Sequence, residues 1–397
     1  MTNQKMYAFG ASPSTIRELF EYGKSRKKLI GEDNVFDFSL GNPSVASPEI
    51  VNETLVKLLN DTNPTILHGY TSSAGDLEVR ESIAVYLNQT YGTSHLASLI
   101  YLTVGAAASL TISLNALLNK DEEVIVFAPF FPEYLVFVEK ASGVLKVVPP
   151  HEPSFQPDLD VFEKMINEKT KVVIINSPNN PTGVVYNEDT LEKMGKILKE
   201  KSLEYDHPIY LLSDEPYREL VYDDVKTPFI SKYYDNTIIG YSFSKSLSLP
   251  GERIGYIVVS EKCDNAQEVF LSICGAGRSL GFVCAPALFQ YMIPYCLGKT
   301  ADLSIYKTNR DLLYESLVSY GYEVVKPDGA FYLFVKALES DANKFAEKAK
   351  KYELIVVPSD SFGYSGYVRI AYCVATEQVK KSLPSFKKLI EEYQKEE

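Results

Sequence analysis

Residues 241–256 read YSFSKSLSLPGERIGY, a serine-rich turn around Lys245 that lies between two apolar runs. The runs cover residues 237–241 and 254–259, and their short length and β-branched members predict two strands. A lysine in such a turn is partly shielded from water. A desolvated amine loses its proton more readily and can then attack a carbonyl group.

Three side chains near Lys245 supply hydrogen-bond donors for an anion, namely Ser242, Ser244 and Arg253. A nucleophilic lysine beside a phosphate-sized group of donors indicates pyridoxal 5'-phosphate held as a Schiff base. The alternative is a surface lysine in a polar turn. Other parts of the chain must therefore supply the partners that decide between the two.

Composition limits the class of protein. The chain of 397 residues is long enough for one to three domains, and its 45% hydrophobic and 23% charged residues are ordinary for a globular protein. The net charge of −12, without a long basic run, argues against nucleic acid or an anionic membrane as partner.

Neither a signal pattern nor an apolar run of membrane-spanning length is found in the sequence. The five cysteines form no CxxC pair, which fits reduced thiols and predicts a cytoplasmic protein. The four histidines do not have metal-ligand spacing, so we expect no metal site.

Strands and helices alternate from about residue 123 onward, which indicates a mostly parallel sheet covered on both faces. The predicted strands are 123–127, 144–148, 171–176, 210–213, 237–241 and 254–259, and the predicted helices between them are 135–141, 159–167 and 190–203. Ligands of such sheets bind beyond the carboxyl ends of the strands. Four candidate residues fall at those ends: Phe131, Asn180, Asp214 and Lys245.

The two ends of the chain have a different pattern. We expect a helix over 14–23 that begins at Ser12-Pro13, a strand over 36–40, and helices over 48–60 and 76–88. After a long helix over 301–320, strands at 331–335, 354–357 and 367–372 predict a smaller α+β unit. The last helix begins at Thr376, and Pro384 predicts a kink or two pieces there.

A helix also opens at residues 104–109, where small residues let backbone N–H groups approach an anion. A well-packed helix start explains the same residues. Two motifs follow predicted strands: NSPNNPTG at 176–183 and DEPY at 214–217. Each motif alone is weak evidence for a site, because an ordinary loop turn or a helix cap explains it. Their occurrence in this order together with Lys245 and Arg253 is much less expected by chance.

In these motifs the sequence resembles the class I/II aminotransferases of the aspartate aminotransferase type, which are fold-type-I pyridoxal-phosphate enzymes. The resemblance extends from Gly41 to Arg369. It implies a three-layer α/β large domain with a mostly parallel seven-stranded sheet, over 49–299, and a smaller α+β domain from 1–48 and 300–397. It also implies transfer of an amino group from an L-amino acid to a 2-oxo acid by a ping-pong mechanism.

The resemblance gives roles to the residues of the motifs. Lys245 matches the lysine that forms the aldimine with pyridoxal phosphate, and Asp214 matches the carboxylate that pairs with the ring nitrogen. Asn180 and Tyr217 match the pair that bonds the ring 3'-oxygen, and Phe131 matches the stacked aromatic ring. The residues that match the phosphate site are Ala106, Ala107, Ser242, Ser244 and Arg253.

Arg369 matches the arginine that binds the substrate α-carboxylate, with Asn180 beside it, and Gly41 matches the glycine that closes over the same group. A surface salt bridge is the alternative for Arg369. Tyr70 matches a tyrosine that reaches the phosphate of the neighbouring subunit, which implies a homodimer with shared sites.

Two departures bear on an aspartate-type substrate. Several bacterial aspartate-specific members carry a lysine where this chain has Ala107. In other members an arginine of the partner chain meets the side-chain carboxylate, and Arg278 lies in that neighbourhood of the sequence. A surface arginine without this role is the alternative.

Two rival functions share part of this pattern. A pyridoxal-phosphate lyase of the same fold, such as a carbon–sulfur lyase, would use the same cofactor residues. A non-catalytic cofactor-binding module of a transcription regulator would need an added winged-helix domain, for which we expect no room before Gly41.

Overall fold

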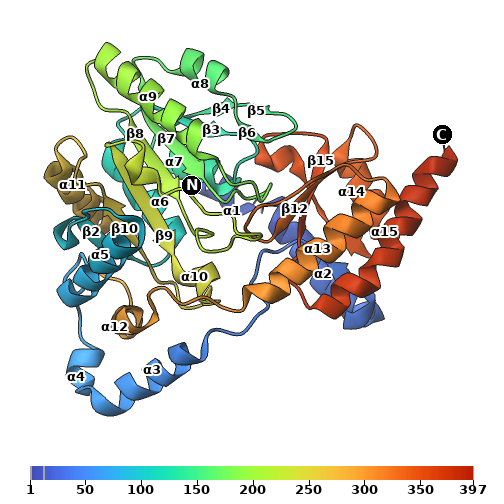
Figure 1. Cartoon of the computed structure of the whole chain (residues 1–397), viewed down its shortest axis with the longest axis horizontal. Helices are drawn as coiled ribbons and strands as arrows, with labels where there is room; N and C mark the ends of the chain where they lie inside the picture. The colour runs from blue at the N-terminus through green and yellow to red at the C-terminus, as the bar shows by residue number, and fades with distance from the viewer. Residues whose placement is uncertain (1, 12–13, 397) are drawn as a thin grey trace.

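The structure is a computed structural model that describes residues 2–11 and 14–396. A large body and a smaller body lie side by side, with helix α13 (Leu303–Tyr320) packed beside the smaller sheet (Figure 1). The predicted helix start at Ser12-Pro13 lies outside the described residues. The helix itself, α2 (Thr15–Ile30), is longer than the predicted 14–23.

The large body is built on a seven-stranded sheet with the strand order β2-β10-β9-β8-β7-β3-β4. Its strands are β2 (Ile100–Thr103), β3 (Glu123–Phe127), β4 (Val144–Val148), β7 (Thr170–Asn176), β8 (Tyr210–Asp214), β9 (Thr237–Ser242) and β10 (Gly255–Val259). Only β10 runs antiparallel to its neighbours β2 and β9. The predicted α/β class with a mostly parallel sheet is confirmed.

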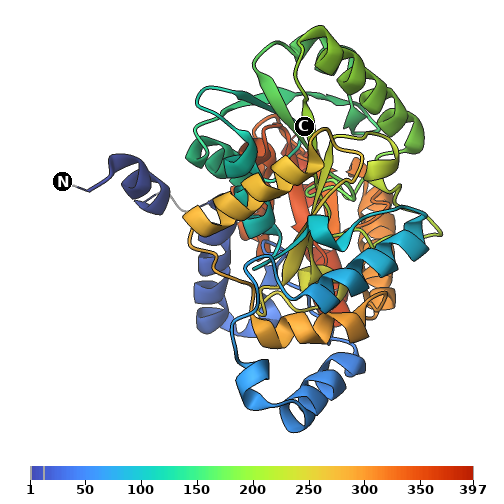
Figure 2. The ribbon, with the colours of Figure 1, turned by 90° about the vertical axis from the view of Figure 1, so that its left-hand side faces the viewer.

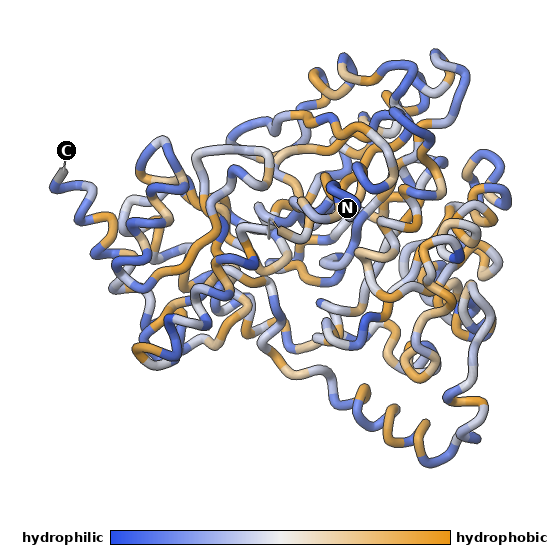
Figure 3. Tube along the Cα trace, turned by 180° about the vertical axis from the view of Figure 1, so that it is seen from behind, coloured by the Kyte–Doolittle hydropathy of each residue, from blue (hydrophilic) through white to orange (hydrophobic). Residues whose placement is uncertain are grey.

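Helices cover both faces of this sheet because strand side chains alternate between the faces. On β3, Ile125 and Phe127 belong to one core and Val124 and Val126 to the other. The first core includes α3 (Glu49–Asp61), α5 (Leu77–Tyr91), α8 (Leu159–Met165), α9 (Glu188–Glu204) and α12 (Ala287–Cys296). The second includes α6 (Ala106–Leu117), α7 (Glu133–Lys140) and α11 (Ala266–Ser279). Apolar residues gather along the central strands, whereas apolar and polar residues alternate along the outer helices (Figure 3).

The smaller body contains an antiparallel sheet with the order β11-β12-β15-β14. Its strands are β11 (Val324–Val325), β12 (Tyr332–Lys336), β14 (Val357–Pro358) and β15 (Tyr367–Ala371). Helices α13, α14 (Ala342–Lys350) and α15 (Thr376–Glu396) bury a separate core against it. A parallel pair, β1 (Phe36–Asp37) with β13 (Leu354–Ile355), lies beside it.

The remaining elements are short. They are α1 (Gln4–Ala11), α4 (Pro64–Leu67), α10 (Phe243–Ser246), the hairpin strands β5 (Pro150–His151) and β6 (Gln156–Pro157), and four 3-10 turns at Glu32–Asn34, Ala97–Leu99, Ile230–Lys232 and Ser359–Phe362. Helix α1 projects from the body (Figure 2), has no buried residue, and touches α7 through Lys5 and Glu139. Among the described residues, none of the helices is both long and apolar enough to cross a bilayer.

Two predicted strands were wrong. The strand predicted over 354–357 divides into two, because Leu354 and Ile355 pair with β1 whereas Val357 pairs with β15. The strand predicted over 36–40 ends at Asp37. Of the kink or two pieces predicted at Pro384, the two pieces are excluded, because Pro384 lies inside a single helix, α15, and buried Val379 and Phe386 pack into one core on either side of it.

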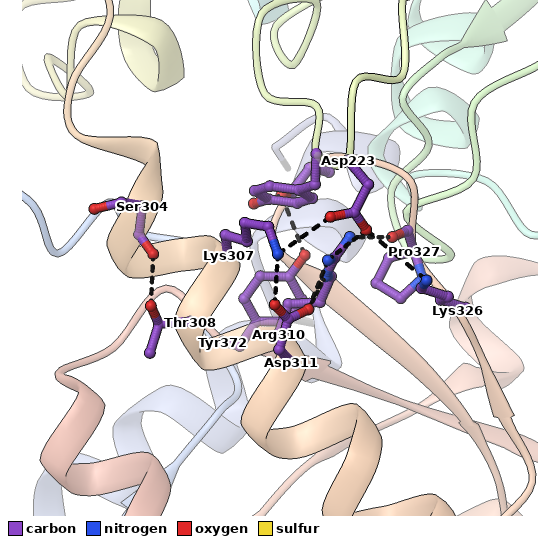
Figure 4. A network of polar contacts seen from close by, with 11 residues as sticks. Asp223, Ser304, Lys307, Thr308, Arg310, Asp311, Lys326, Pro327 and Tyr372 are labelled. Atoms are coloured by element: carbon purple, nitrogen blue, oxygen red, sulfur yellow. Dashed lines mark hydrogen bonds and ion pairs between the residues drawn. The ribbon is translucent and has the colours of Figure 1, made fainter.

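A cluster of charged side chains ties the loop after β8 to helix α13 (Figure 4). The Arg310 guanidinium, 2% exposed, donates to Asp223 at 2.7 Å and to Asp311 at 2.6 Å. Lys307 lies 3.1 Å from Asp223, and Lys326 lies 3.8 Å from it at the surface. Arg310 is therefore the buried member that holds both carboxylates.

We expect Arg310→Met to lower the unfolding midpoint in urea clearly. The change removes several charge-assisted hydrogen bonds, each of which contributes about 1.5–3 kcal/mol when buried. The control is Lys326→Met, which removes a surface cation worth about 0.2–1 kcal/mol. Equal midpoints for the two variants, measured at one protein concentration, would contradict this view of the cluster.

Candidate active site

The carboxyl ends of β7, β8 and β9 form one edge of the large sheet, and polar residues gather there. Asn176 and Asp214 are the last residues of β7 and β8 and lie opposite each other in the pairing. The Asn176 side-chain amide donates to the Asp214 backbone carbonyl at 2.8 Å. Lys245 follows β9 in the short helix α10. Parallel pairing thus brings residues that are distant in the sequence to one place.

A cavity of about 280 Å³ opens at this edge. Its lining includes most of the predicted site residues: Gly41, Ala106, Ala107, Phe131, Asn180, Asp214, Tyr217, Ser242, Ser244, Lys245, Arg253 and Arg369. They come from both bodies of the molecule, because Gly41 and Arg369 belong to segments around the smaller sheet. The cavity is therefore a cleft between the two.

Lys245 is half-buried in this cavity. Its Nζ donates to the backbone carbonyl of Gly41 at 2.6 Å and lies 5.3 Å from the centre of the Phe331 ring. Burial lowers the Lys245 pKa from 10.5 to about 8, since a charged amine is poorly solvated there. Gly41 must lack a side chain, because a Cβ would lie 2.1 Å from the Tyr332 hydroxyl.

Asp214 offers a buried carboxylate to the same cavity. One oxygen, Oδ2, accepts a hydrogen bond of 2.6 Å from the Tyr134 hydroxyl. The other, Oδ1, is buried and has no hydrogen-bond partner in the described part of the chain. Burial raises the Asp214 pKa from 3.8 to about 7. A buried carboxylate oxygen without a partner is costly, so a cationic N–H group of a ligand fits this position.

The opposite end of the cavity suits an anion. The first amides of α6 have no partner within their own helix, and the helix dipole favours negative charge there. The Ser242 hydroxyl lies 2.7 Å from that of Ser244, and Arg253 Nη1 donates to Ser244 Oγ at 3.4 Å. Gly105, with φ of +90°, lets Arg253 approach, because a Cβ there would lie 2.6 Å from the guanidinium.

Arg369 is a buried cation on β15, 2% exposed. Its Nη1 donates to Asn180 Oδ1 at 3.1 Å, and its Nη2 donates to the Ser39 carbonyl. Its Nε is buried without a partner among the described residues. The Tyr332 ring lies 4.6 Å from the guanidinium carbon. The alternative of a surface salt bridge is therefore excluded for Arg369, and a carboxylate ligand would satisfy the unpartnered Nε–H.

Tyr217 lines the same cavity as these charged groups. Its hydroxyl is 2.8 Å from the Tyr332 hydroxyl, and burial raises the pKa of Tyr217 well above 10.0. A neutral hydroxyl pair can donate one hydrogen bond to an oxygen atom in the cavity.

Among the described residues we find no group of three histidine, cysteine or acidic side chains that could hold a metal ion.

Comparison with known proteins places this geometry in a family. The family model for aminotransferase class I and II matches residues 33–385. The chain belongs to this family. It is 33% identical to an aspartate aminotransferase of Thermotoga maritima, over 93% of this chain and 95% of the relative. It is 29% identical to an aromatic-amino-acid aminotransferase of Thermococcus litoralis, over 96% of each.

A crystal structure of an amino transferase from Eubacterium rectale is also similar. It is 53% identical to this chain, covers 99% of both chains and superposes with a TM-score of 0.97. The chain is therefore an aminotransferase, as its motifs predict. The carbon–sulfur lyase and the non-catalytic module of a regulator find no support in these relatives.

Two predicted residues of the aminotransferase do not reach its own cavity. Tyr70 is 91% exposed, and Arg278 at the end of α11 is exposed as well. Neither belongs to the residues that line the cavity. Both were predicted to act in a neighbouring subunit, and their exposure leaves them available to one.

Other cavity residues of the aminotransferase were missed by the sequence analysis. They are Ile16, Leu40, Leu110, Asn176, Pro216, Pro250 and Tyr332. Asn176 carried a signal, since it ends the predicted strand 171–176, much as Asp214 follows the predicted strand 210–213. Ile16 and Tyr332 did not, because α2 and β12 are brought to the cavity only by tertiary packing.

We predict that Lys245 reacts with aldehydes at a lower pH than surface lysines do. Because its pKa is lowered to about 8, the reactive neutral amine predominates above that pH instead of above 10.5. The measurement is the rate of labelling of cofactor-free protein by an aldehyde and borohydride, read by peptide mass spectrometry from pH 6 to 10, a span of about two units on each side of that pKa. Surface lysines in the same digest are the reference. A Lys245 profile that coincides with theirs would contradict the prediction.

Proposed function

We propose that this aminotransferase uses pyridoxal 5'-phosphate to move the amino group of an L-amino acid to a 2-oxo acid in two half-reactions. The observation that carries the proposal is the unpaired Asp214 Oδ1, which lines one cavity with Lys245 and the anion site at α6. These three features match the ring nitrogen, aldehyde and phosphate of that cofactor.

When bound, pyridoxal phosphate supplies a carbonyl that takes up the amino group and a ring that accepts electrons from the substrate α-carbon. Asp214 would hold the protonated ring nitrogen, and Phe131 would cover the ring. Asn180 and Tyr217 would bond the 3'-oxygen. The phosphate would be held by Ala106, Ala107, Ser242, Ser244 and Arg253, with the partner's Tyr70.

Lys245 has two tasks in this proposal. Its neutral amine would bond the aldehyde of the cofactor. As a base, the same amine would take the α-proton of the substrate and hold it at Nζ until it is returned. A pKa of about 8 suits this shuttle, since both protonation states are accessible near neutral pH.

The substrate α-carboxylate is proposed to bind Arg369. The guanidinium already donates to Asn180 and to the Ser39 carbonyl, so its orientation is fixed before substrate arrives. Its unpartnered Nε is then free for a carboxylate oxygen. The Gly41 backbone, which approaches Tyr332 closely, closes the same side.

Asp214→Asn should lower the rate of the first half-reaction by about two to four orders of magnitude, because loss of one partner of a buried ion pair costs about 3–5 kcal/mol. The readout is single-turnover formation of 2-oxo acid and pyridoxamine phosphate, which also separates transfer from a lyase reaction. Asp121→Asn, at an exposed carboxylate, is the control. A nearly unchanged rate in Asp214→Asn would refute the role of this carboxylate.

We further propose a homodimer with shared active sites. Apolar side chains on α3 and α4 support it, since Val56, Leu59 and Ile66 are 58%, 52% and 58% exposed. Tyr70 follows α4 directly and is 91% exposed. A second copy that covers this surface would receive the Tyr70 hydroxyl at its phosphate site.

Mixed dimers test the sharing. Chains with Tyr70→Phe and chains with Lys245→Ala, each strongly impaired alone, are predicted to regain activity after mixing, because one site of the hybrid carries no lesion. The control mixes Lys245→Ala with Asp214→Asn. Both of these lesions lie in a chain's own cavity, so no recovery is expected. A Tyr70→Phe mixture no better than its parents speaks against shared sites.

The proposed donor is an acidic amino acid, aspartate or glutamate, and the names of two relatives, which are called aspartate aminotransferases, support aspartate. A desolvated side-chain carboxylate needs a second cation. Arg369 is committed to the α-carboxylate, and Ala107 carries no charge. Arg278 of the second copy is the candidate, and its exposure supports this.

Arg278→Ala should reduce kcat/KM for aspartate by about a hundredfold or more, because an unpaired buried charge costs about 3–5 kcal/mol. Alanine and aromatic donors should change little, since they do not use that cation. An equal effect on all donors, or none, removes the basis of the proposal. The apolar residues Ile16, Leu40 and Leu110 of the cavity would then favour a neutral or aromatic donor.

Two further points belong to the proposal. The domain division into 49–299 and 1–48 with 300–397 is supported by the separate cores of the two bodies. A cytoplasmic location is supported by the five cysteines, all of which are free thiols.

A further inference from the structure

Tyr134 on α7 is a buried tyrosine that the sequence analysis did not single out. Its side chain is 2% exposed, and its ring lies nearly parallel to that of Phe130 and perpendicular to that of Phe131, with ring centres 6.5 and 5.7 Å away. Its ring belongs to the second core, and its hydroxyl donates a hydrogen bond of 2.6 Å to Asp214 Oδ2. An ionised carboxylate only accepts hydrogen bonds, so the tyrosine is the donor.

We propose that Tyr134 is a positioning residue, which fixes Asp214 by one carboxylate oxygen so that the other faces the ring nitrogen of the cofactor. This inference rests on the proposed use of pyridoxal phosphate. The geometry supports it, because Oδ2 is committed to Tyr134 whereas Oδ1 is buried without a partner in the described part of the chain.

The hydroxyl also acts on the charge of Asp214. Burial disfavours the ionised carboxylate and raises the Asp214 pKa to about 7, and the neighbouring Glu215 carboxylate raises it as well. The hydrogen bond from Tyr134 works in the opposite direction. Tyr217 also interacts with Asp214 and remains neutral because burial raises its pKa, and the cations Lys245, Arg253 and Arg369 line the same cavity. Asn176 bonds the backbone carbonyl of Asp214 and leaves the carboxylate unaffected.

Removal of the Tyr134 hydroxyl therefore changes the Asp214 pKa in a defined direction. Without Tyr134 as donor, the Asp214 pKa rises further, and a smaller fraction of the carboxylate is ionised at and below neutral pH. The protonated ring nitrogen then lacks its counter-charge. Well above neutral pH Asp214 is ionised in either case, so the electrostatic part of the effect disappears there.

Tyr134→Phe tests the proposal, since it keeps the ring and removes one oxygen. The readout is the dissociation constant for pyridoxal phosphate, titrated by absorbance into cofactor-free protein below and above neutral pH. We expect affinity about 10- to 100-fold weaker below neutral pH, the effect of one lost hydrogen bond to a charged group, and a smaller difference above it. Because both proteins share all other titrating groups, the ratio of their constants reports on Asp214.

Tyr322→Phe is the matched control. It removes another buried tyrosine hydroxyl, which donates to the Phe386 carbonyl at 2.8 Å within the smaller body. Its dissociation constant should equal that of the parent at each pH. If Tyr322→Phe weakens binding as Tyr134→Phe does, the effect is a general loss of packing and the proposal is overturned.

Two further measurements keep the test decisive. In an Asp214→Asn background, Tyr134→Phe should change the dissociation constant little, because no ionised carboxylate remains to be held. Replacement of Tyr134 by 3-fluorotyrosine, a more acidic phenol that donates a stronger hydrogen bond, should tighten binding below neutral pH while it keeps the hydroxyl and its packing. An unchanged constant with 3-fluorotyrosine, or an equal loss in the Asp214→Asn background, overturns the proposal.

The outcomes also distinguish a failure of the proposed function from a failure of the role proposed for Tyr134. A parent protein that does not bind pyridoxal phosphate refutes the proposed function and this inference together. A parent that binds it, with a Tyr134→Phe variant of the same affinity and pH dependence, refutes only the role of Tyr134.

Discussion

Charged groups that are buried without an oppositely charged partner among the described residues are the constraint on which this site depends. Asp214 and Arg369 are nearly inaccessible to water, Lys245 is half-buried, and no ion pair joins them to each other in the described part of the chain. Such groups destabilise a fold unless a ligand pairs with them. In the proposed complex, a cationic ring nitrogen would pair with Asp214, a carboxylate would pair with Arg369, and a carbonyl would react with Lys245.

The segment after β8 shows how the chain holds these charges in place. Asp214 and Tyr217 face the cavity, whereas Glu215 and Arg218 turn into the core and pair at 2.5 Å. The Arg218 guanidinium also lies 4.6 Å from the ring of Tyr241 on β9. A buried ion pair one and four residues after Asp214 thus anchors the segment that presents this carboxylate to the cavity.

Much of this arrangement follows from sequence because parallel strands bring their carboxyl ends to one edge. Asp214, Asn180 and Lys245 each follow a predicted strand, so their proximity needed only the topology. Tyr134 and Tyr332 could not be found in this way, since their hydroxyl contacts join residues separated by 80 and 115 positions. Helix α15 passes through Pro384 because burial on both sides outweighs one lost hydrogen bond.

Covalent capture of the cofactor tests the central claim most directly. Protein incubated with pyridoxal phosphate is reduced with borohydride, digested, and mapped by mass spectrometry. The account predicts that the added mass is found on the peptide that contains Lys245. Fixation at a different lysine, or no fixation under conditions where the protein retains its fold, would contradict it.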